Sequence, residues 1–434
     1  MSDIAAPSNY VRQDLVPERT APVKTTGFVG FLRTQLLNSP TNILLTVLGL
    51  LLLWFTVIPA LKFLLIDAVW QGTDREACLT QNAGHPVGAC WPYIEAKFPQ
   101  FIYGFYPQSE RWRVNLTYLL AVLLLVPLLI PRLPDKGLNA GLFFIAFPVI
   151  AYFLLHGGGM IGFAIAAVIV SVLLFFLGGG IRTGWRALVI SLALFASVAI
   201  VIGALGFEHD GYGLPLVDTR QWGGLLVTLV VSVTGIVSSV PIGIALALGR
   251  RSTIPLIRIC SVAFIELWRG VPLITVLFFA TYMLPLFLPG GFTIDALVRV
   301  LIGVALFAGA YTAEVIRGGL QAIPRGQGEA ASALGLSYWK TTALIVMPQA
   351  LRHVIPGFVN SFIAMFKDTS LVSIVAIFDL LGVLHASFAD PVWATPTQLF
   401  TGFAFTGMIY FIFCFGMSRY SLFVEKRLNA HRRN

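Results

Sequence analysis

Long runs of apolar residues restrict the fold of this chain more than any other feature. Ten runs lie at about 43–66, 115–131, 138–155, 160–178, 187–206, 222–249, 262–288, 294–317, 353–385 and 399–423. The first would extend about 36 Å as an α-helix, which exceeds the roughly 30 Å hydrocarbon core of a bilayer. Since backbone polar groups need partners inside a bilayer, the runs predict an all-α polytopic membrane protein with about ten transmembrane helices.

The charged residues favour the same class and indicate an orientation. Only 11% of the 434 residues are charged, and a soluble globule carries about 25%. The net charge of +9 does not indicate a nucleic-acid partner, because most Lys and Arg flank the apolar runs. An excess of basic residues marks cytoplasmic loops, so we expect both termini to be cytoplasmic and the chain to be surrounded by membrane lipid.

The distribution of charge divides the chain into regions. Residues 1–41 are polar and predict a cytosolic N-terminal tail, and 42–210 form an accessory transmembrane region with an outer loop at 67–113. Residues 215–434 hold nearly all the charges that fall inside apolar runs. Because a charge within a bilayer is costly, we expect the functional site in this second half.

A polar stretch between two apolar runs has its own pattern. Residues 329–348 read EAASALGLSYWKTTALIVMP, in which helix formers precede Gly335 and a second helical run follows it. Glycine readily adopts the left-handed conformation that ends a helix. The stretch therefore predicts a short helix–turn–helix outside the membrane.

This stretch resembles the EAA loop of ABC importer permeases. The residues that match are Glu329, Ala330, Ala331, Gly335, Ile345 and Pro348, with Met347 in place of the usual Leu. Other strings in the second half, ELWRGVPL at 266–273, YTAEVIRGGL at 311–320 and KDTSL at 367–371, are similar to permeases of polar amino acid importers. The first half is similar to the long permeases of general L-amino acid systems, including the glutamate/glutamine/aspartate/asparagine type.

The resemblance implies a function and a set of partners. The chain would be a permease subunit in the bacterial inner membrane, part of an ATP-driven importer for L-amino acids that works by alternating access. The loop at 321–350 would couple it to a dimeric ATP-binding subunit, and a second related permease and a periplasmic binding protein would complete the complex. ATP and Mg would be used by the ATPase, and this chain would bind neither cofactor nor metal.

The sequence itself agrees that the chain has no ATPase site. It lacks the pattern G-x-x-x-x-G-K-[ST], in which a glycine-rich loop and a Lys hold nucleotide phosphates. The chain is therefore expected to be a transport subunit and not an enzyme. The alternative class is an ion-coupled secondary transporter or a channel, which would use its intramembrane charges as an ion pathway.

Two Glu–Arg pairs lie three residues apart in the second half. Glu266 with Arg269, and Glu314 with Arg317, would face the same side of a helix and can form ion pairs. One interpretation is structural, with the pairs orienting the coupling loop. The other is gating, with the pairs exchanging partners as the helices tilt.

A polar stretch interrupts the run at 353–385. Lys367, Asp368, Thr369 and Ser370 fall near the middle of this run, which is longer than one crossing needs. A break there would expose backbone groups, which is tolerated where they line a cavity. We hypothesise that Asp368 binds a substrate ammonium while Thr369, Ser370 and nearby N–H groups bind its carboxylate. The alternative is an unbroken helix in which Lys367 and Asp368 form a structural ion pair to a partner permease.

The outer loop contains two cysteines and many aromatic residues. Cys78 and Cys90 would form a disulfide if the loop lies in the periplasm, and the alternatives are two free thiols or metal ligation together with His85. The aromatic residues suit a lid at the membrane interface, and a docking surface for a soluble partner is the other interpretation.

Overall fold

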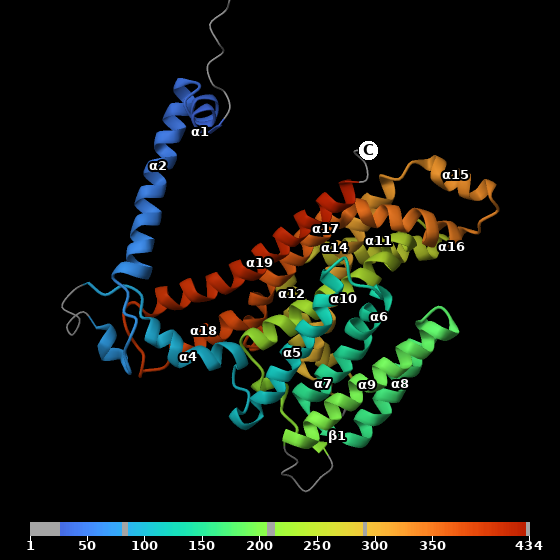
Figure 1. Ribbon diagram of the computed structural model, residues 1–434, viewed down its shortest axis with the longest axis horizontal. Helices are drawn as coiled ribbons and strands as arrows, with labels where there is room; N and C mark the ends of the chain where they lie inside the picture. Colours follow the sequence, from blue (N-terminus) through green and yellow to red (C-terminus); the bar gives the residue numbers. More distant parts are fainter. Residues whose placement is uncertain (1–26, 80–85, 206–212, 290–292, 431–434) are drawn as a thin grey trace, which may run out of the picture. The chain divides into compact units, whose positions relative to one another are not determined.

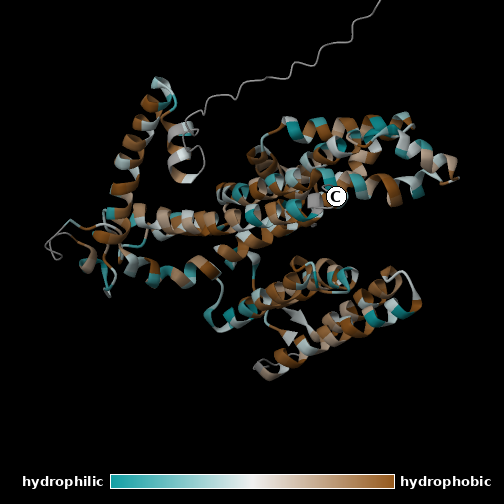
Figure 2. Cartoon of the chain, turned by 45° about the horizontal axis from the view of Figure 1, so that its top comes forward, coloured by the Kyte–Doolittle hydropathy of each residue, from teal (hydrophilic) through white to brown (hydrophobic). Residues whose placement is uncertain are grey.

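The computed structural model describes residues 27–79, 86–205, 213–289 and 293–430, and these are mostly helical (Figure 1). Within them, nine helices are long and apolar enough to cross a membrane, and a bent helix pair makes a tenth. Figure 2 shows hydrophobic residues along the lengths of these helices. The all-α polytopic class is therefore confirmed. Most of the expected tail, residues 1–26, and part of the expected boundary, residues 210–212, lie outside the described residues.

The chain divides into two compact units, and the smaller one consists of Met1–Ala68 and His85–Ala89. Its main element is α2 (Pro40–Leu61), which continues through η2 (Lys62–Ile66) and follows the short helices α1 (Gly27–Phe31) and η1 (Leu32–Leu36). Ser39 caps α2 by accepting a hydrogen bond from the Asn42 N–H at 3.2 Å, and Pro40 occupies the first position. No residue of α2 is buried within the structure, and a helix that is apolar on all sides suits a lipid environment.

The larger unit, Val69–Gly84 with Cys90–Asn434, begins with the accessory helices. These are α5 (Arg111–Leu129), α6 (Lys136–Gly141) continuing through η5 (Leu142–Ala146) into α7 (Phe147–His156), α8 (Met160–Leu177) and α9 (Ile181–Leu205). Their buried faces form one apolar cluster that includes Leu120, Ile150, Leu154, Phe163 and Val198. Ser171 of α8 and Ser191 of α9 share a buried hydrogen bond of 2.9 Å.

A buried arginine fixes the connection between the accessory helices and the second half. In this connection β1 (Gly158–Gly159) pairs antiparallel with β2 (Gly213–Leu214). Arg113 of α5 is fully buried and donates from Nη1 and Nη2 to the Pro215 carbonyl at 3.0 and 2.9 Å. Its Nε lies 3.0 Å from a Glu110 carboxylate oxygen. Thus a side chain of α5 holds the backbone that follows β2.

Four long helices make the core of the second half: α10 (Leu225–Arg250), α14 (Ala296–Gln321), α17 (Met347–Asp368) and α19 (Gln398–Ala430). Small residues bring α10 and α14 close together. A Cβ at Gly243 of α10 would lie only 3.0 Å from the Ala313 backbone nitrogen of α14. Leu226 and Val231 of α10, Val304 of α14 and Met365 of α17 belong to one apolar cluster.

The run at 262–288 was expected to be one span, and the structure has a bent helix pair there. The structure has α11 (Pro255–Gly270) and then α12 (Leu273–Phe278), η7 (Phe279–Met283) and α13 (Leu284–Phe287), with a bend of 103° at the break. Pro272 has no N–H to continue α11 and forces the preceding residue into extended backbone. Val271 accordingly has φ −108° and ψ 134°.

The run at 353–385 also has different ends. The helical segment begins at α16 (Tyr338–Thr341), continues through η8 (Thr342–Val346) and α17, and ends with the 3₁₀ turns of η9 (Thr369–Val375). Ala376 then takes a left-handed φ of 61°, which ends the segment. A separate short helix, α18 (Leu380–Ser387), follows, and the Asp379 carboxylate caps it by accepting from the Leu381 and Gly382 N–H groups.

Candidate functional site

The loop between α14 and α17 forms the expected helix–turn–helix. Glu329, Ala330 and Ala331 lie in α15 (Arg325–Ala333). Gly335 has a φ of +74°, the conformation for which glycine was expected, and α16 begins at Tyr338. Pro348 lies in α17 directly after η8, within the helical segment that begins at Tyr338. We call the end of the core that carries α15 the coupling-loop end (Figure 1).

Apolar side chains at the tip of this loop are exposed. Leu334 is 78% exposed, Tyr338 58% and Trp339 69%, and the two aromatic rings meet edge-to-face at 5.4 Å. Ala331, in contrast, is buried and holds α15 to its neighbours. A cavity of about 750 Å³ separates α15 from the ends of α10 and α14. The loop therefore presents an apolar surface that the other described residues leave uncovered.

Five charged side chains meet near the coupling-loop end, and we call them the charged cluster: Arg250, Glu266, Arg269, Glu314 and Arg317. Glu314 is the centre, because its carboxylate contacts all three arginines. Arg250 Nη1 lies 2.9 Å from one oxygen, and Arg317 Nη2 lies 2.9 Å from the other. Arg269 Nη1 is more distant, at 3.5 Å.

One of the two expected pairs is not formed within the described residues. Glu314 and Arg317 do pair along α14, as their spacing predicts. Glu266, however, pairs with Arg250 of α10 at 3.0 Å, and Arg269 pairs with Glu314. The expectation of a Glu266–Arg269 pair was wrong because it considered one helix alone, whereas α10, α11 and α14 bring their charges together.

A cavity of about 360 Å³ lies between α10, α14 and α17, and we call it the central cavity. Its polar lining consists of Ser239, Tyr311, Thr312, Asn360, Ser361 and Asp368, and the rest is apolar. Asp368 is the last residue of α17 and the only charged residue in this lining. Its carboxylate forms no ion pair with any residue that the structure describes.

The other three residues of the expected binding stretch lie elsewhere. Thr369 is fully buried and its hydroxyl donates to the Phe366 carbonyl at 2.8 Å, and the Ser370 hydroxyl donates to the Lys367 carbonyl at 2.9 Å. Lys367 is exposed and does not line the central cavity. The break in the helix is present, but 3₁₀ turns follow it directly, so it offers no free helix start to a carboxylate.

Sequence reasoning missed Asn360, Ser361 and Tyr311. The signal for the first two was available, since an amide and a hydroxyl stand together inside an apolar run. Tyr311 was part of a matched string but had no assigned role. Its position in the lining depends on which face of α14 meets α17.

Curated relatives share nearly the whole chain. It is 42% identical to "Inner membrane amino-acid ABC transporter permease protein YhdY" of Escherichia coli (strain K12), over 96% of this chain and 97% of that protein. It is also 42% identical to "Glutamate/glutamine/aspartate/asparagine transport system permease protein BztC" of Rhodobacter capsulatus, over 98% and 99%. The chain belongs to the amino-acid ABC transporter permeases.

Two further comparisons cover the second half of the permease. Residues 239–430 match the family described as "Binding-protein-dependent transport system inner membrane component". The solved structure described as "Crystal structure of an amino acid ABC transporter with histidines" is 29% identical, covers 47% of the permease and 92% of that chain, and superposes with a TM-score of 0.42. The near full-length relatives, the matched family and the apolar helices together make the permease a multi-pass inner-membrane protein of amino-acid transport.

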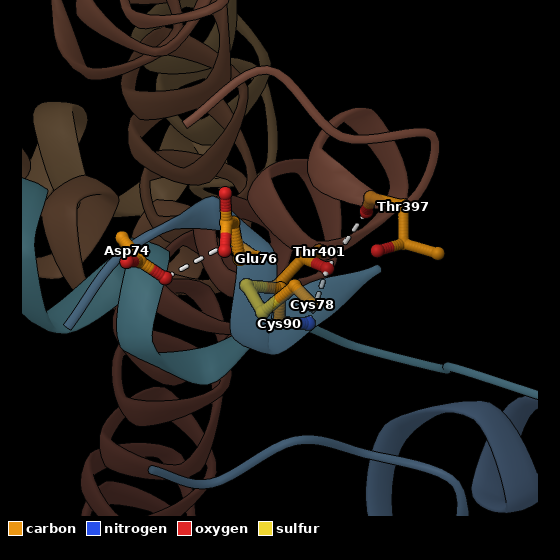
Figure 3. The surroundings of a disulfide bond; sticks show 6 residues. All are labelled: Asp74, Glu76, Cys78, Cys90, Thr397 and Thr401. Atoms are coloured by element: carbon orange, nitrogen blue, oxygen red, sulfur yellow. Dashed lines mark hydrogen bonds between the residues drawn. A yellow bond between two sulfur atoms is a disulfide. The ribbon is translucent and has the colours of Figure 1, made fainter. Parts of the chain in front are cut away.

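The outer loop of the permease packs on its core. Cys78 and Cys90 are joined by a disulfide, and the Cys90 N–H donates to Thr401 Oγ1 of α19 at 3.0 Å (Figure 3). This threonine in turn donates to the Thr397 carbonyl at 2.8 Å (Figure 3). His85, the residue of the alternative metal site, lies outside the described residues.

The helix α4 (Trp91–Tyr103) continues this contact over α18 and α19. Tyr93 and Phe101 are fully buried, and the Tyr93 hydroxyl hydrogen-bonds with Ser387. Lys97 forms an ion pair with Asp390, and this ammonium lowers the pKa of the Asp390 carboxyl. The loop therefore has the packing of a lid on the core, and its use as a docking surface stays a prediction.

Proposed function

We propose that this permease is the membrane subunit of an ATP-driven importer for L-amino acids. A separate ATP-binding dimer would dock on the coupling loop, a second related permease would complete the pathway, and a periplasmic binding protein would deliver substrate. ATP and Mg would belong to the ATPase, and both termini of the permease would be cytoplasmic.

The uncovered apolar tip of the coupling loop carries this proposal. Large apolar side chains on a polar loop are costly to expose, and at protein interfaces such residues are frequently those that dominate binding. Leu334, Tyr338 and Trp339 form such a group beside the resemblance-derived contact residues Glu329 to Gly335. Movement of α15 would be passed to the core through α16, η8 and α17, which follow α15 in the chain.

The central cavity supports the transport pathway. Its volume falls within the range of sites for small ligands, and its lining combines apolar walls with a few polar groups. An uncompensated carboxylate inside a membrane span is expensive unless a ligand or water meets it. Asp368 would bind the ammonium group that every amino acid substrate carries. Alternating access would then open this cavity to each side in turn.

The test is uptake in proteoliposomes that contain the complete complex. Amino acid uptake should require ATP and persist when ion gradients are collapsed, and Asp368→Ala should abolish it while the complex still assembles. Asp135→Ala, which changes an exposed carboxylate of the accessory region, is the control and should transport normally. Uptake by the permease alone, driven by an ion gradient, would establish the secondary-transporter alternative instead.

A further inference from the structure

The central cavity lacks a positive charge for a substrate carboxylate. An amino acid carries at least one carboxylate, and inside a membrane this group needs a cation or several hydrogen-bond donors. Asp368 is negative, and no Lys, Arg or His belongs to the described lining. The Thr369 and Ser370 hydroxyls donate to backbone carbonyls.

One arginine, Arg269, contacts a residue of this lining, Tyr311. The Arg269 guanidinium carbon lies 5.6 Å from the centre of the Tyr311 ring, a cation–π distance, and Tyr311 lines the cavity. Arg269 is the penultimate residue of α11, directly before the 103° bend. About a third of its side chain, 35%, remains exposed.

The charged cluster contains one more positive than negative side chain. Three arginines face two glutamates, which leaves a formal excess of one. Arg317 makes hydrogen bonds of 3.0 and 3.1 Å to Glu314 from Nε, and Arg250 makes one of 2.9 Å. Arg269 has only the 3.5 Å ion pair and makes no hydrogen bond within the described residues. It is therefore the arginine whose donors are unused.

The separation of Tyr311 and Asp368 along the helix bundle limits which substrates can contact both Arg269 and Asp368. Val315 of α14 lies against Gly357 of α17, and Gly319 lies against Ala350, so the two helices run antiparallel. This register places Tyr311 level with Ser361 and about 10 Å along the bundle from Asp368, at 1.5 Å per residue. The ammonium and carboxylate on one carbon are only about 3 Å apart. A substrate that contacts both residues must therefore reach one of them with its side chain.

We propose that Arg269 binds a carboxylate group of the transported amino acid at the Tyr311 side of the central cavity. The planar guanidinium can donate two parallel hydrogen bonds to a carboxylate, which makes it selective for that group. Bound substrate would replace Glu314 as the partner of Arg269, while Arg250 and Arg317 keep Glu314 neutralised. This inference rests on the proposed function, and it assigns to Arg269 a role in substrate recognition.

The test measures substrate binding without the binding protein, which would otherwise dominate selectivity. Radiolabelled L-glutamate and L-glutamine are titrated onto the permease–ATPase complex in nanodiscs. Arg269→Gln should raise the dissociation constant at least tenfold for the ligand whose carboxylate it binds, and Arg269→Lys should raise it less. Arg186→Gln is the control, because it removes an exposed arginine that pairs with Asp135 outside the charged cluster, and it should leave the dissociation constant within about twofold.

Two comparisons identify which carboxylate is bound. If Arg269 binds the side-chain carboxylate, the substitution weakens glutamate and leaves glutamine unchanged. If both ligands weaken, Arg269 binds the α-carboxylate, and the ammonium on the same carbon then lies too far from Asp368 to contact it. Only the first pattern supports the proposal, and the second contradicts the roles given to Arg269 and Asp368 together.

Other outcomes overturn it. Equal effects of Arg269→Gln and Arg186→Gln would show that the loss is not specific to Arg269, and unchanged binding in Arg269→Gln would show that Arg269 does not contact the substrate. ATP-driven uptake by a wild-type complex that shows no measurable binding would overturn the inference and leave the proposed function intact. Absence of ATP-driven amino acid uptake in the wild type would instead defeat the proposed function.

Discussion

The buried Arg113 offers a quantitative test of how the accessory helices are joined to the core. Its guanidinium is fully buried, donates twice to the Pro215 carbonyl and pairs with Glu110. Arg113→Met keeps most of the side-chain length but removes the charge and the donors. Hydrogen bonds from a charged donor are worth about 1.5–3 kcal/mol, and removing one partner of a buried ion pair costs about 3–5 kcal/mol.

We therefore expect Arg113→Met to destabilise the permease by about 3 kcal/mol. For a chain of this size each kcal/mol lowers the unfolding temperature by roughly 2 °C, so the shift should be about 6 °C. The assay is thermal unfolding of the purified permease in one detergent at one scan rate, because membrane proteins commonly unfold irreversibly.

The matched control is Arg186→Met in the same accessory region. Arg186 pairs with Asp135 at 2.8 Å, but its side chain is 53% exposed. Exposed pairs contribute about 0–1 kcal/mol, so this variant should shift the unfolding temperature by 2 °C at most by the same roughly linear relation. Similar shifts in the two variants would refute the reasoning, because burial of Arg113 would then have no energetic consequence.

Three further predictions concern the loops. Trp339→Ala should remove the ATP-binding subunit during co-purification, whereas Trp185→Ala, an equally large exposed side chain of α9, should retain it. Replacing both Cys78 and Cys90 with serine should destabilise the lid by about 3 kcal/mol, because the disulfide closes a short loop across a separation of 12 residues. The measurement is protease cleavage of the lid, which should become faster. Lys97 lowers the pKa of Asp390, so this pair stabilises the fold above the usual Asp pKa of 3.8, and the benefit disappears as the pH falls through the lower folded value. Asp390→Asn should therefore unfold about 1 °C below wild type at pH 6, and the two should converge as the pH falls below the folded pKa of Asp390.

The local elements were predictable because they depend on neighbours in sequence. Apolar runs long enough to cross a bilayer predicted the transmembrane helices, and Gly335 predicted the turn of the coupling loop. The same reasoning failed at Val271, where the apolar run continued but the following proline did not allow one straight helix. Reasoning from apolar runs also placed α18 in the same span as α17, because apolar composition does not reveal the left-handed turn at Ala376.

The candidate site was only partly predictable. Asp368 could be selected as a costly charge within an apolar run, and it lines the central cavity. Thr369 and Ser370 are adjacent in sequence yet point to their own helix. The step of about 100° per residue along a helix separates neighbouring side chains, so which one faces a cavity is decided by packing.

The sequence by itself determined the class of protein, the positions of most spans and the exposed coupling loop, since a bilayer demands long apolar helices and a Gly permits a left-handed turn. Only the tertiary structure decided which charges meet. Arg250, Glu266 and Glu314 come from three helices, and their pairing depends on the register of α10, α11 and α14. Ion pairing follows distance in space, and in a helical bundle the shortest distances join residues far apart in the chain.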